Sequence, residues 1–464
     1  MLLSLVVFGY ATVAGAATLR VCASGCQFSD LQQAIDAAAP GDTILLRAGE
    51  TFIGNVILPS KPASSAWITI RSDAADSQLP ADGVRLIPGG KPGANTSRSL
   101  LARLVGSGGA LKSTPVVMTA PGAHHYRLMF LEIDGTGNIG YETLISLGQD
   151  NALTTATDIV IDRVYAHGHP EKGQKRGIAL NGVRMDVLNS YISEIMAVNA
   201  DSQALAGYNG AGPFRIINNH LEATGENILF GGVDPSIYNL VPTGIEVRRN
   251  TITKPLSWRN PIVARPSSLS GWDAGSGGSL SAGTHYFKVV ALMETGPVVA
   301  HSLASDEAAV SVSGSRSAAL TWSGVAGATR YRIYRGTGSG GQSRYLETSS
   351  PATSYTYSGA GEEWGAPETN ATMWTVKNLI ELKNAQDVVF DGNIIENIWA
   401  AGQFGYAIVL TPRNQSGSAP WVRVRDVSFT NNIIRHAAGA MQIVGYDDNW
   451  PSLQTKRITV RNNL

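Results

Sequence analysis

The stretch Asn219-His-Leu221, which follows the apolar segment Arg215-Ile-Ile217, is one copy of a pattern that recurs along most of the chain. The other copies are Asn189-Ser-Tyr191, Asn250-Thr-Ile252, Asn393-Ile-Ile395, Asn432-Ile-Ile434 and Asn463-Leu464, with Asp162-Arg-Val164 in the same place one repeat before Asn189. From Asp162 onward, successive copies are 27, 30, 31, 143, 39 and 31 residues apart. A repeat of about thirty residues built from short strands predicts a chain that coils and stacks on itself.

Asparagine suits the corner of such a coil for two reasons. It tolerates left-handed backbone angles, and its side chain can bond the backbone of the neighbouring coil. Stacked copies would then form an internal ladder of amide groups. We therefore predict an all-β fold, a right-handed parallel β-helix, for most of the chain.

The composition fits a β-rich chain with many tight turns better than a helical protein. Of the 464 residues, 16% are charged, 43% are apolar and 51 are glycine. The 36 basic and 36 acidic residues give a net charge of zero, which argues against nucleic acid or an anionic membrane as the partner.

The N-terminus has the features of an export signal. Leu2 to Val13 is an apolar run and Ala14-Gly15-Ala16 is a small-residue cleavage pattern, so residues 1–16 are predicted to be a signal peptide. The mature protein would be secreted, either extracellular or periplasmic, and would have no membrane span. Cys22 and Cys26 are then expected to form a local disulfide, because their spacing without a third ligand does not suit zinc.

A short amphipathic helix is predicted over residues 29–39, with Leu31 and Ile35 on its apolar face. Ser29 is the expected N-cap, and Gln32 would complete a capping box. A helix at this place would cover the open end of the stack, where apolar side chains and strand edges would otherwise be exposed.

The same region resembles a known family. The sequence Phe28-Ser-Asp-Leu-Gln-Gln-Ala-Ile-Asp-Ala-Ala-Ala-Pro-Gly-Asp-Thr-Ile44, followed by Ala48-Gly-Glu-Thr-Phe52, looks like the start of pectin-lyase-like β-helix proteins. In that family a helix caps the first coil, and Pro-Gly-Asp turns into the first strand. The resemblance implies the β-helix fold, whereas a shared fold does not fix the chemistry.

The step of 143 residues is too long for one coil and indicates an inserted domain. Residues 261–367 have the length of a small β-sandwich. Three segments in this range, Thr284–Ala291, Ala318–Trp322 and Ala328–Arg335, resemble fibronectin type III strands in a permuted order. The predicted β-helix therefore has two parts, residues 17–260 and residues 368–464, and the second part is predicted to be truncated because it stops within a repeat.

A second strand recurs after each Asn corner, for example Gly177-Ile-Ala-Leu-Asn181 and Tyr406-Ala-Ile-Val-Leu-Thr411. If the Ile and Leu residues of these strands face inward, the period of two places polar residues outward. The predicted outward residues are Asn181, Gln203, Asn227, Glu381, Lys383, Thr411 and Gln442. Because parallel coils stack about 4.8 Å apart, these residues would form one polar face.

This polar face and its flanking loops supply the candidates for chemistry on an acidic polysaccharide. A lyase needs a cation that stabilises the enolate and a base that removes the proton at C5 of a uronic acid. The predicted catalytic residues are Lys383, Glu381, Arg413 and Glu226. The predicted substrate-binding residues are Gln203, Asn227, Asn181, Gln442, Tyr406, Asn414, Lys175 and Arg176. Asp201 and Asp234 are the candidate ligands for Ca²⁺, and no organic cofactor is expected.

The expected function is a secreted polysaccharide lyase that cleaves a uronic-acid-containing glycan by β-elimination. Two alternatives stay open. A glycoside hydrolase on the same scaffold would use two carboxylates, and Glu226 with Glu381 would be that pair. A non-catalytic surface or glycan-binding adhesive protein would also suit the inserted domain and the neutral charge. A polysaccharide is the expected partner, and the protein is expected to be a monomer.

Overall fold

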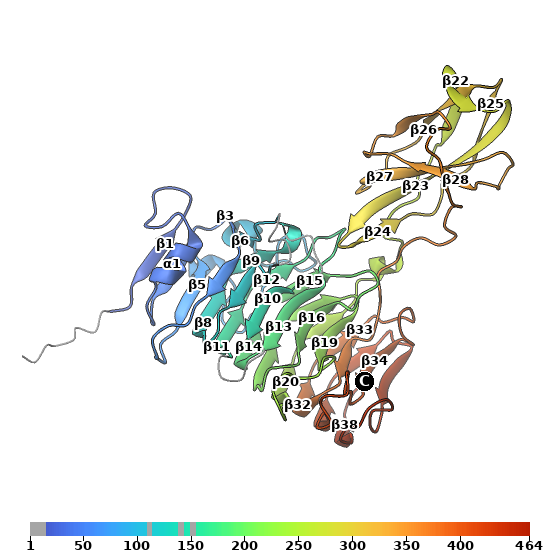
Figure 1. The fold of residues 1–464 in the computed structure, drawn as a ribbon. Helices are drawn as coiled ribbons and strands as arrows, with labels where there is room; N and C mark the ends of the chain where they lie inside the picture. Colours follow the sequence, from blue (N-terminus) through green and yellow to red (C-terminus); the bar gives the residue numbers. More distant parts are fainter. Residues whose placement is uncertain (1–14, 109–113, 138–142, 149–154) are drawn as a thin grey trace, which may run out of the picture.

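A computed structural model of the chain describes residues 15–108, 114–137, 143–148 and 155–464. These residues confirm the predicted fold, a right-handed parallel β-helix (Figure 1). Each complete coil adds one strand to each of three stacked parallel sheets in the described part of the chain, here called sheets A, B and C. The predicted signal peptide lies almost entirely outside the described residues.

The strands of each sheet follow one another in chain order, as expected for a solenoid. Sheet A has the order β1 (Thr18–Val21), β2 (Thr43–Leu46), β5 (Ile68–Ser72), β8 (His124–Met129), β11 (Thr157–Asp162), β14 (Val183–Leu188), β17 (Phe214–Ile217), β20 (Thr243–Arg248), β32 (Ala385–Asp391), β35 (Val424–Thr430) and β38 (Lys456–Arg461). Sheet B has the order β3 (Thr51–Ile53), β6 (Ala102–Val105), β9 (Leu131–Asp134), β12 (Tyr165–His167), β15 (Tyr191–Ile195), β18 (His220–Ala223), β21 (Thr251–Thr253), β33 (Ile394–Glu396) and β36 (Ile433–Arg435). Sheet C has the order β4 (Val56–Leu58), β7 (Val117–Thr119), β10 (Thr143–Gly148), β13 (Arg176–Asn181), β16 (Gln203–Gly207), β19 (Glu226–Phe230), β31 (Ile380–Leu382), β34 (Tyr406–Leu410) and β37 (Gly439–Ile443).

The core of the β-helix consists of apolar side chains stacked in register between coils. In sheet C, Ile178 pairs with Leu205, Leu205 with Ile228, and Ile228 with Ile380, and all of these are fully buried. In sheet A, the rings of Phe390 and Phe429 stack with their centroids 4.6 Å apart. Burial of such rows supplies the main stabilising free energy, at about 25 cal/mol for each Å² of apolar surface.

The predicted asparagine ladder is present at the corner between sheets A and B. Asn219, Asn250, Asn393, Asn432 and Asn463 form consecutive rungs. In each rung the side-chain oxygen of one Asn accepts from the backbone N–H of the Asn before it, over 2.8–2.9 Å. The side-chain nitrogens of Asn250 and Asn393 also donate to carbonyl groups inside the stack, those of Ile216 and Val247. The ladder therefore satisfies buried backbone groups that the turn leaves without a partner.

Two details of the predicted ladder are wrong. Ser190, not Asn189, aligns with Asn219, because Tyr191 pairs with His220 and the Ser190 N–H donates to the Asn219 side chain over 2.9 Å. Asp162 is also displaced, because it pairs with Leu188. The left-handed backbone belongs to the residue before each rung, for example Asn218 with φ 57°. The ladder Asn residues are thus selected for their amide groups rather than for a left-handed conformation.

The inserted segment forms antiparallel strands with a buried core of their own, and Figure 1 shows them standing away from the stack. One sheet has the order β22 (Ser270–Leu280), β26 (Arg316–Thr321) and β29 (Ser354–Tyr357). The other has the order β24 (Val298–His301), β23 (Gly283–Thr295), β27 (Arg330–Gly336), β28 (Arg344–Glu347) and β30 (Glu363–Trp364), and β25 (Ala308–Val312) pairs with β23. The likeness to fibronectin type III stays a prediction. The β-helix continues past this insertion, because β20 pairs directly with β32.

The N-terminal end of the stack carries helix α1 (Leu31–Ala37). Its N-cap is Asp30, whose side chain accepts from Gln33 N–H over 2.8 Å, so the predicted Ser29 cap is wrong. Gln32 instead forms two hydrogen bonds with the backbone of Ile57 on the edge strand β4, at 2.8 and 2.9 Å. The helix thereby protects a strand edge that has no neighbour.

The remaining features of the chain are local. Cys22 and Cys26 form the predicted disulfide. Short 3-10 helices are η1 (Asp76–Gln78), η2 (Arg98–Leu100), η4 (Gly135–Gly137) and η5 (Leu256–Arg259). None of the helices in the described ranges has the length and apolarity that a membrane-spanning segment needs.

Candidate functional site

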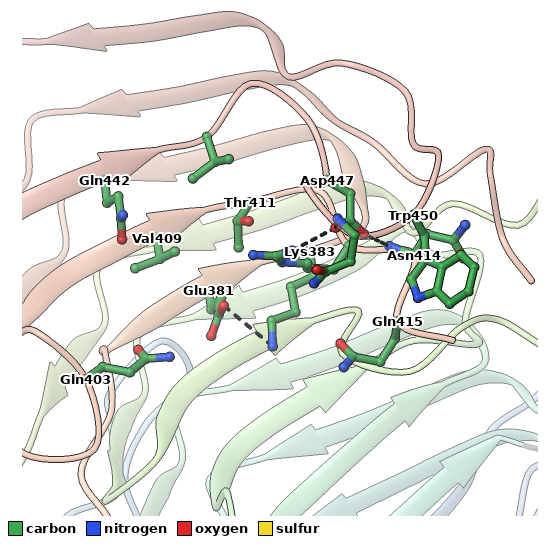
Figure 2. Close-up of a pocket in the computed structure, with 13 residues that line it drawn as sticks. Glu381, Lys383, Gln403, Val409, Thr411, Asn414, Gln415, Gln442, Asp447 and Trp450 are labelled. Carbon is green, nitrogen blue, oxygen red and sulfur yellow. Dashed lines mark hydrogen bonds and ion pairs between the residues drawn. The ribbon is translucent and has the colours of Figure 1, made fainter. Parts of the chain in front are cut away.

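A polar cavity of about 620 Å³ lies on the outer face of sheet C, where the last strands of the sheet end (Figure 2). Its lining comes from β31, β34, β37 and the loops that follow them, together with Gln403 from the segment before β34. The lining residues are Glu381, Lys383, Gln403, Val409, Thr411, Arg413, Asn414, Gln415, Gln442, Val444, Asp447, Asn449 and Trp450. The cavity thus joins two cations, two buried carboxyl groups (Glu381 and Asp447) and several amide side chains.

The alternation of the strands places these side chains on one face. Ile380 and Leu382 are fully buried in the core, so Glu381 between them points outward. In the parallel register Glu381 pairs with Val409, and Val409 pairs with Gln442. Lys383 and Arg413 follow the carboxyl ends of their strands, one coil apart, where loops leave the sheet.

Glu381 lies at the floor of the cavity and is only 3% exposed. Its Oε1 atom is 3.6 Å from the Lys383 ammonium, a pair that Figure 2 marks with a dashed line. Its buried Oε2 atom has no hydrogen-bond partner among the described residues. Burial, together with the neighbouring charge of Glu226, raises the pKa of Glu381 to about 7 although Lys383 lowers it. This carboxyl group can therefore exchange a proton near neutral pH.

Glu226 begins the adjacent strand β19 and is fully buried. Its carboxylate is 2.7 Å from the Lys377 ammonium and accepts from the Gln203 amide over 3.0 Å. Burial alone would raise the pKa of Glu226, but Lys377 and Gln203 more than offset it, so that the pKa is lowered. Lys377 also donates to Asp201 over 2.7 Å. Glu226 is thus held as an ionised carboxylate.

Arg413 is fixed at the other side of the cavity by two aspartates. Its guanidinium donates to Asp447 over 2.7 Å and also contacts Asp448. Asp447 further accepts from the backbone N–H of Asn414 over 2.8 Å, which shapes the loop around the cavity. The arginine is therefore oriented before any ligand binds, which reduces the entropy that binding an anionic group costs.

The predicted site residues separate into those at the cavity and those outside it. Glu381, Lys383, Arg413, Asn414 and Gln442 come together as lining residues. Arg176 and Gln203 are linked to them from behind, because Arg176 donates to Gln203 over 3.1 Å and Gln203 donates to Glu226. Lys175 and Tyr406 do not line the cavity.

Two predicted binding residues are structural. Asn181 is 8% exposed, and its side-chain oxygen accepts from the backbone N–H groups of Tyr208 and Asn209, both at 3.1 Å. Asn227 is fully buried, where it donates to two carbonyl groups and accepts from the Lys254 ammonium over 2.9 Å. The prediction that both point outward to a ligand is wrong because their amide groups satisfy buried backbone at the coil corners.

The two predicted Ca²⁺ ligands are not brought together. Asp201 bonds Lys377, whereas the Asp234 carboxylate accepts from the backbone N–H groups of Gln415, Ser416 and Ser418 at 2.5–3.1 Å. The Lys377 ammonium stabilises the Asp201 carboxylate, and three backbone N–H donors stabilise the Asp234 carboxylate. Ca²⁺ itself stays a prediction.

A group with metal-ligand residue types lies on sheet B, among Glu132, Asp134 and His167. Arg98 contacts Glu132, and Arg103 donates to Asp134 over 2.7 Å. Two guanidinium groups thus already neutralise the two carboxylates, so this group is a buried ion network.

Sequence reasoning missed Lys377 and several cavity residues, namely Gln403, Gln415, Asn449 and Trp450. For Lys377 a signal was available, because it precedes its strand in the same way as Asp201 precedes β16. The other residues belong to long irregular loops, whose course over the sheet no periodicity predicts.

Comparison with known proteins gives similarity to solved structures only. No family model matches the chain, and no curated protein matches it. An alginate lyase from Paenibacillus sp. str. FPU-7 is 14% identical, with 94% of this chain and 99% of that chain covered and a TM-score of 0.32. The A-module of the mannuronan C-5 epimerase AlgE4 from Azotobacter vinelandii is 12% identical, with coverages of 94% and 96% and a TM-score of 0.35. A polygalacturonase from Erwinia carotovora ssp. carotovora is 11% identical, with coverages of 99% and 97% and a TM-score of 0.38.

Proposed function

We propose that this chain is a secreted polysaccharide lyase that cleaves a uronic-acid-containing glycan by β-elimination at the cavity on sheet C. The observation that carries this proposal is the placement of Glu381. A buried carboxyl group with a pKa of about 7 lies in a polar cavity that also contains the cations Lys383 and Arg413.

Each step of a β-elimination has a group in the cavity that can perform it. Arg413 and Lys383 bind the carboxylate at C6 of the uronic acid and stabilise the enolate that forms when C5 loses its proton. Glu381, in its ionised form, takes that proton. The electron pair of the C5–H bond then forms the double bond between C4 and C5, and the bond from C4 to the leaving oxygen breaks. The leaving oxygen takes a proton from Glu381 or from water.

Hydrolysis fits the same residues less well. A glycosidase needs two carboxyl groups on opposite sides of the bond that breaks, roughly 5 to 9.5 Å apart. Glu226 is fully buried, is bonded by Lys377 and Gln203, and does not line the cavity. These two carboxyl groups therefore cannot flank a sugar.

Product analysis tests the proposal. The purified chain is incubated with a panel of uronic-acid polymers and neutral polymers, and the products are followed by ultraviolet absorbance and by their reducing ends. A lyase gives unsaturated products from the acidic polymers only. New reducing ends without ultraviolet absorbance would instead indicate a hydrolase, and no cleavage of any polymer would indicate a non-catalytic protein.

The proposal predicts how cleavage depends on pH. Because Glu381 must be ionised to accept the proton, kcat/KM should rise as the pH increases through about 7, the value to which burial and Glu226 raise the pKa of Glu381. The measurement is kcat/KM between acidic and mildly alkaline pH at constant ionic strength. A limb with its midpoint near the ordinary value of 4.5 for a glutamate would contradict the assignment of Glu381 as the base.

Removing the Lys383 ammonium should weaken binding of the anionic glycan. Lys383→Met keeps most of the side-chain volume but loses one charged contact, so we expect KM to rise roughly tenfold, which corresponds to about 1.4 kcal/mol. Lys456→Met, at an exposed residue that starts β38, is the matched control and should leave KM unchanged. Equal effects of both variants would show that the cavity does not bind the substrate carboxylate.

A further inference from the structure

One aromatic side chain faces the cavity on sheet C. Among the described residues that line the cavity, Trp450 is the only aromatic one, and it is 51% exposed. Figure 2 shows Trp450 beside Asn414 and Gln415, at the opposite end of the cavity from Gln403, with Lys383 between the two ends. Covering a half-exposed indole with the apolar face of a ligand removes apolar surface from water and therefore favours binding.

The indole packs against the loop of the preceding coil. Gly417 in that loop has φ 84°, and a Cβ atom on it would lie 3.0–3.3 Å from three atoms of the Trp450 ring. Glycine is thus required at this position both for its left-handed backbone and for the close approach of the ring. The indole is packed against protein in one part and exposed to the cavity in another.

Both chain neighbours of Trp450 are held by hydrogen bonds. The backbone N–H of Asn449 donates to the Asp447 carboxylate over 3.0 Å, and the carbonyl of Pro451 accepts from the Asn414 amide over 2.9 Å. The position of Trp450 between them is therefore largely set before a ligand binds, which lowers the entropy that binding costs.

The same aspartate joins the ring to a cation of the cavity. Asp447 also accepts from the Arg413 guanidinium over 2.7 Å, so the arginine and the turn of Trp450 share one anchor. Gln415 and Asn449, which line the cavity with Trp450, are exposed and carry neutral amides that can bond hydroxyl groups. A cation suits a carboxylate, whereas an aromatic ring with neutral amides suits the C–H groups and hydroxyl groups of a sugar ring.

We propose that Trp450 is a stacking surface for the sugar next to the uronic acid that Arg413 and Lys383 hold, and that it favours glycans joined through equatorial bonds. This inference deepens the proposed function and rests on it for the presence of a uronic-acid glycan in the cavity. In a chain with equatorial linkages, each pyranose offers a flat face of axial C–H groups, which the electron-rich face of an indole attracts. Axial linkages bend the chain, so that it covers a flat ring less well.

Replacing the ring should change binding and leave the chemical step intact. Trp450→Leu keeps an apolar side chain but loses the flat ring, so KM for β-1,4-glucuronan, which has equatorial linkages, should rise roughly tenfold with kcat unchanged. KM for α-1,4-galacturonan, which has axial linkages, should change little. Trp450→Phe keeps a smaller ring and should show a smaller rise in KM for the glucuronan.

The matched control is a tryptophan of similar exposure outside the cavity. Trp272 is 55% exposed on β22 of the inserted segment, and Trp272→Leu should leave KM unchanged. Binding is measured separately by calorimetry on the full chain carrying Glu381→Gln, so that no bond is cleaved. The probes are glucuronic acid and the tetramers of both polymers. Adding Trp450→Leu should weaken the glucuronan tetramer roughly tenfold and leave the monomer unchanged, because a single sugar does not reach the ring.

The pattern across probes and variants decides the inference. A loss of affinity confined to the glucuronan tetramer and to the Trp450 variants supports it, and Trp450→Phe is decisive if Trp450→Leu fails to fold. Unchanged affinity, equal losses for both tetramers or for both tryptophans, or no binding of the glucuronan tetramer while Trp450 is present overturns it. If affinity changes as expected but no form of the protein cleaves any polymer, the proposed function fails and the stacking surface stands. If Trp450→Leu cleaves uronic-acid polymers with the KM of the natural chain, the stacking surface fails and the proposed function stands.

Discussion

Glu381→Gln is expected to lower kcat for glycan cleavage by roughly 10²- to 10⁴-fold, the usual contribution of a positioned general base. The substitution keeps the shape of the side chain, but an amide cannot accept the proton from C5. Binding should change little, because Lys383 and Arg413 still face the substrate carboxylate. The measurement combines the rate of formation of unsaturated product with the affinity of the variant for a uronic-acid oligomer.

A matched control separates this effect from a general loss of structure. Glu396→Gln alters a carboxylate on β33 of sheet B that pairs with Arg435, outside the cavity, and should retain full activity. If Glu381→Gln also retained activity, Glu381 would not be the base. If both variants lost activity, the assay would be reporting damage to the fold.

Glu381→Gln should also be more stable than the natural protein at alkaline pH. Glu381 has a folded-state pKa of about 7, raised above its ordinary value of 4.5. A group with a raised pKa contributes stability that is complete below the unfolded value and is lost as the pH rises through the folded value. At pH of about 8, an uncharged Gln avoids a buried charge that costs roughly 3 kcal/mol, so its unfolding midpoint in urea should be higher. Such opposite effects on activity and stability are typical of a functional site.

The sequence predicts the stack well because its signal is local and repeated. Asn250, Asn393 and Asn432 each follow an apolar strand, and the same spacing reappears as consecutive rungs in the structure. The register of the earlier coils is less determined, because Asn189 and Ser190 both suit a corner. Only the pairing of Tyr191 with His220 selects Ser190. Because Asn and Ser both suit a corner, their residue types alone do not show which of the two aligns with Asn219.

The candidate site is predictable in part for the same reason. The period of two places Glu381 outward, and the strand ends place Lys383 and Arg413 one coil apart. The ion pair of Lys377 with Glu226 depends on the pairing of β19 with β31 across the inserted domain. The outward placement predicted for Asn181 and Asn227 is wrong because a polar side chain at a coil corner can satisfy buried backbone as well as bind a ligand.

Asn393→Leu is expected to destabilise the β-helix by about 4 kcal/mol, since several buried polar groups lose their partners at once. Asn393 is the rung that joins the second part of the stack to the first, and it is 1% exposed. Its side-chain oxygen accepts from the backbone and side-chain nitrogens of Asn250 at 2.9 and 3.0 Å, and its own side-chain nitrogen donates to Val247 and Asn432. Leucine has a similar volume, so the loss would come from hydrogen bonds rather than from a cavity.

The control for this prediction is the same substitution at the last rung. Asn463→Leu removes equivalent hydrogen bonds at a partly exposed position, where water can replace the lost partners, so its cost should be about 1 kcal/mol. Urea unfolding followed by circular dichroism and by tryptophan fluorescence measures both variants. Equal destabilisation would show that burial does not determine the strength of a rung. If Asn393→Leu were as stable as the natural chain, the apolar rows alone would hold the two parts of the stack together across the inserted domain.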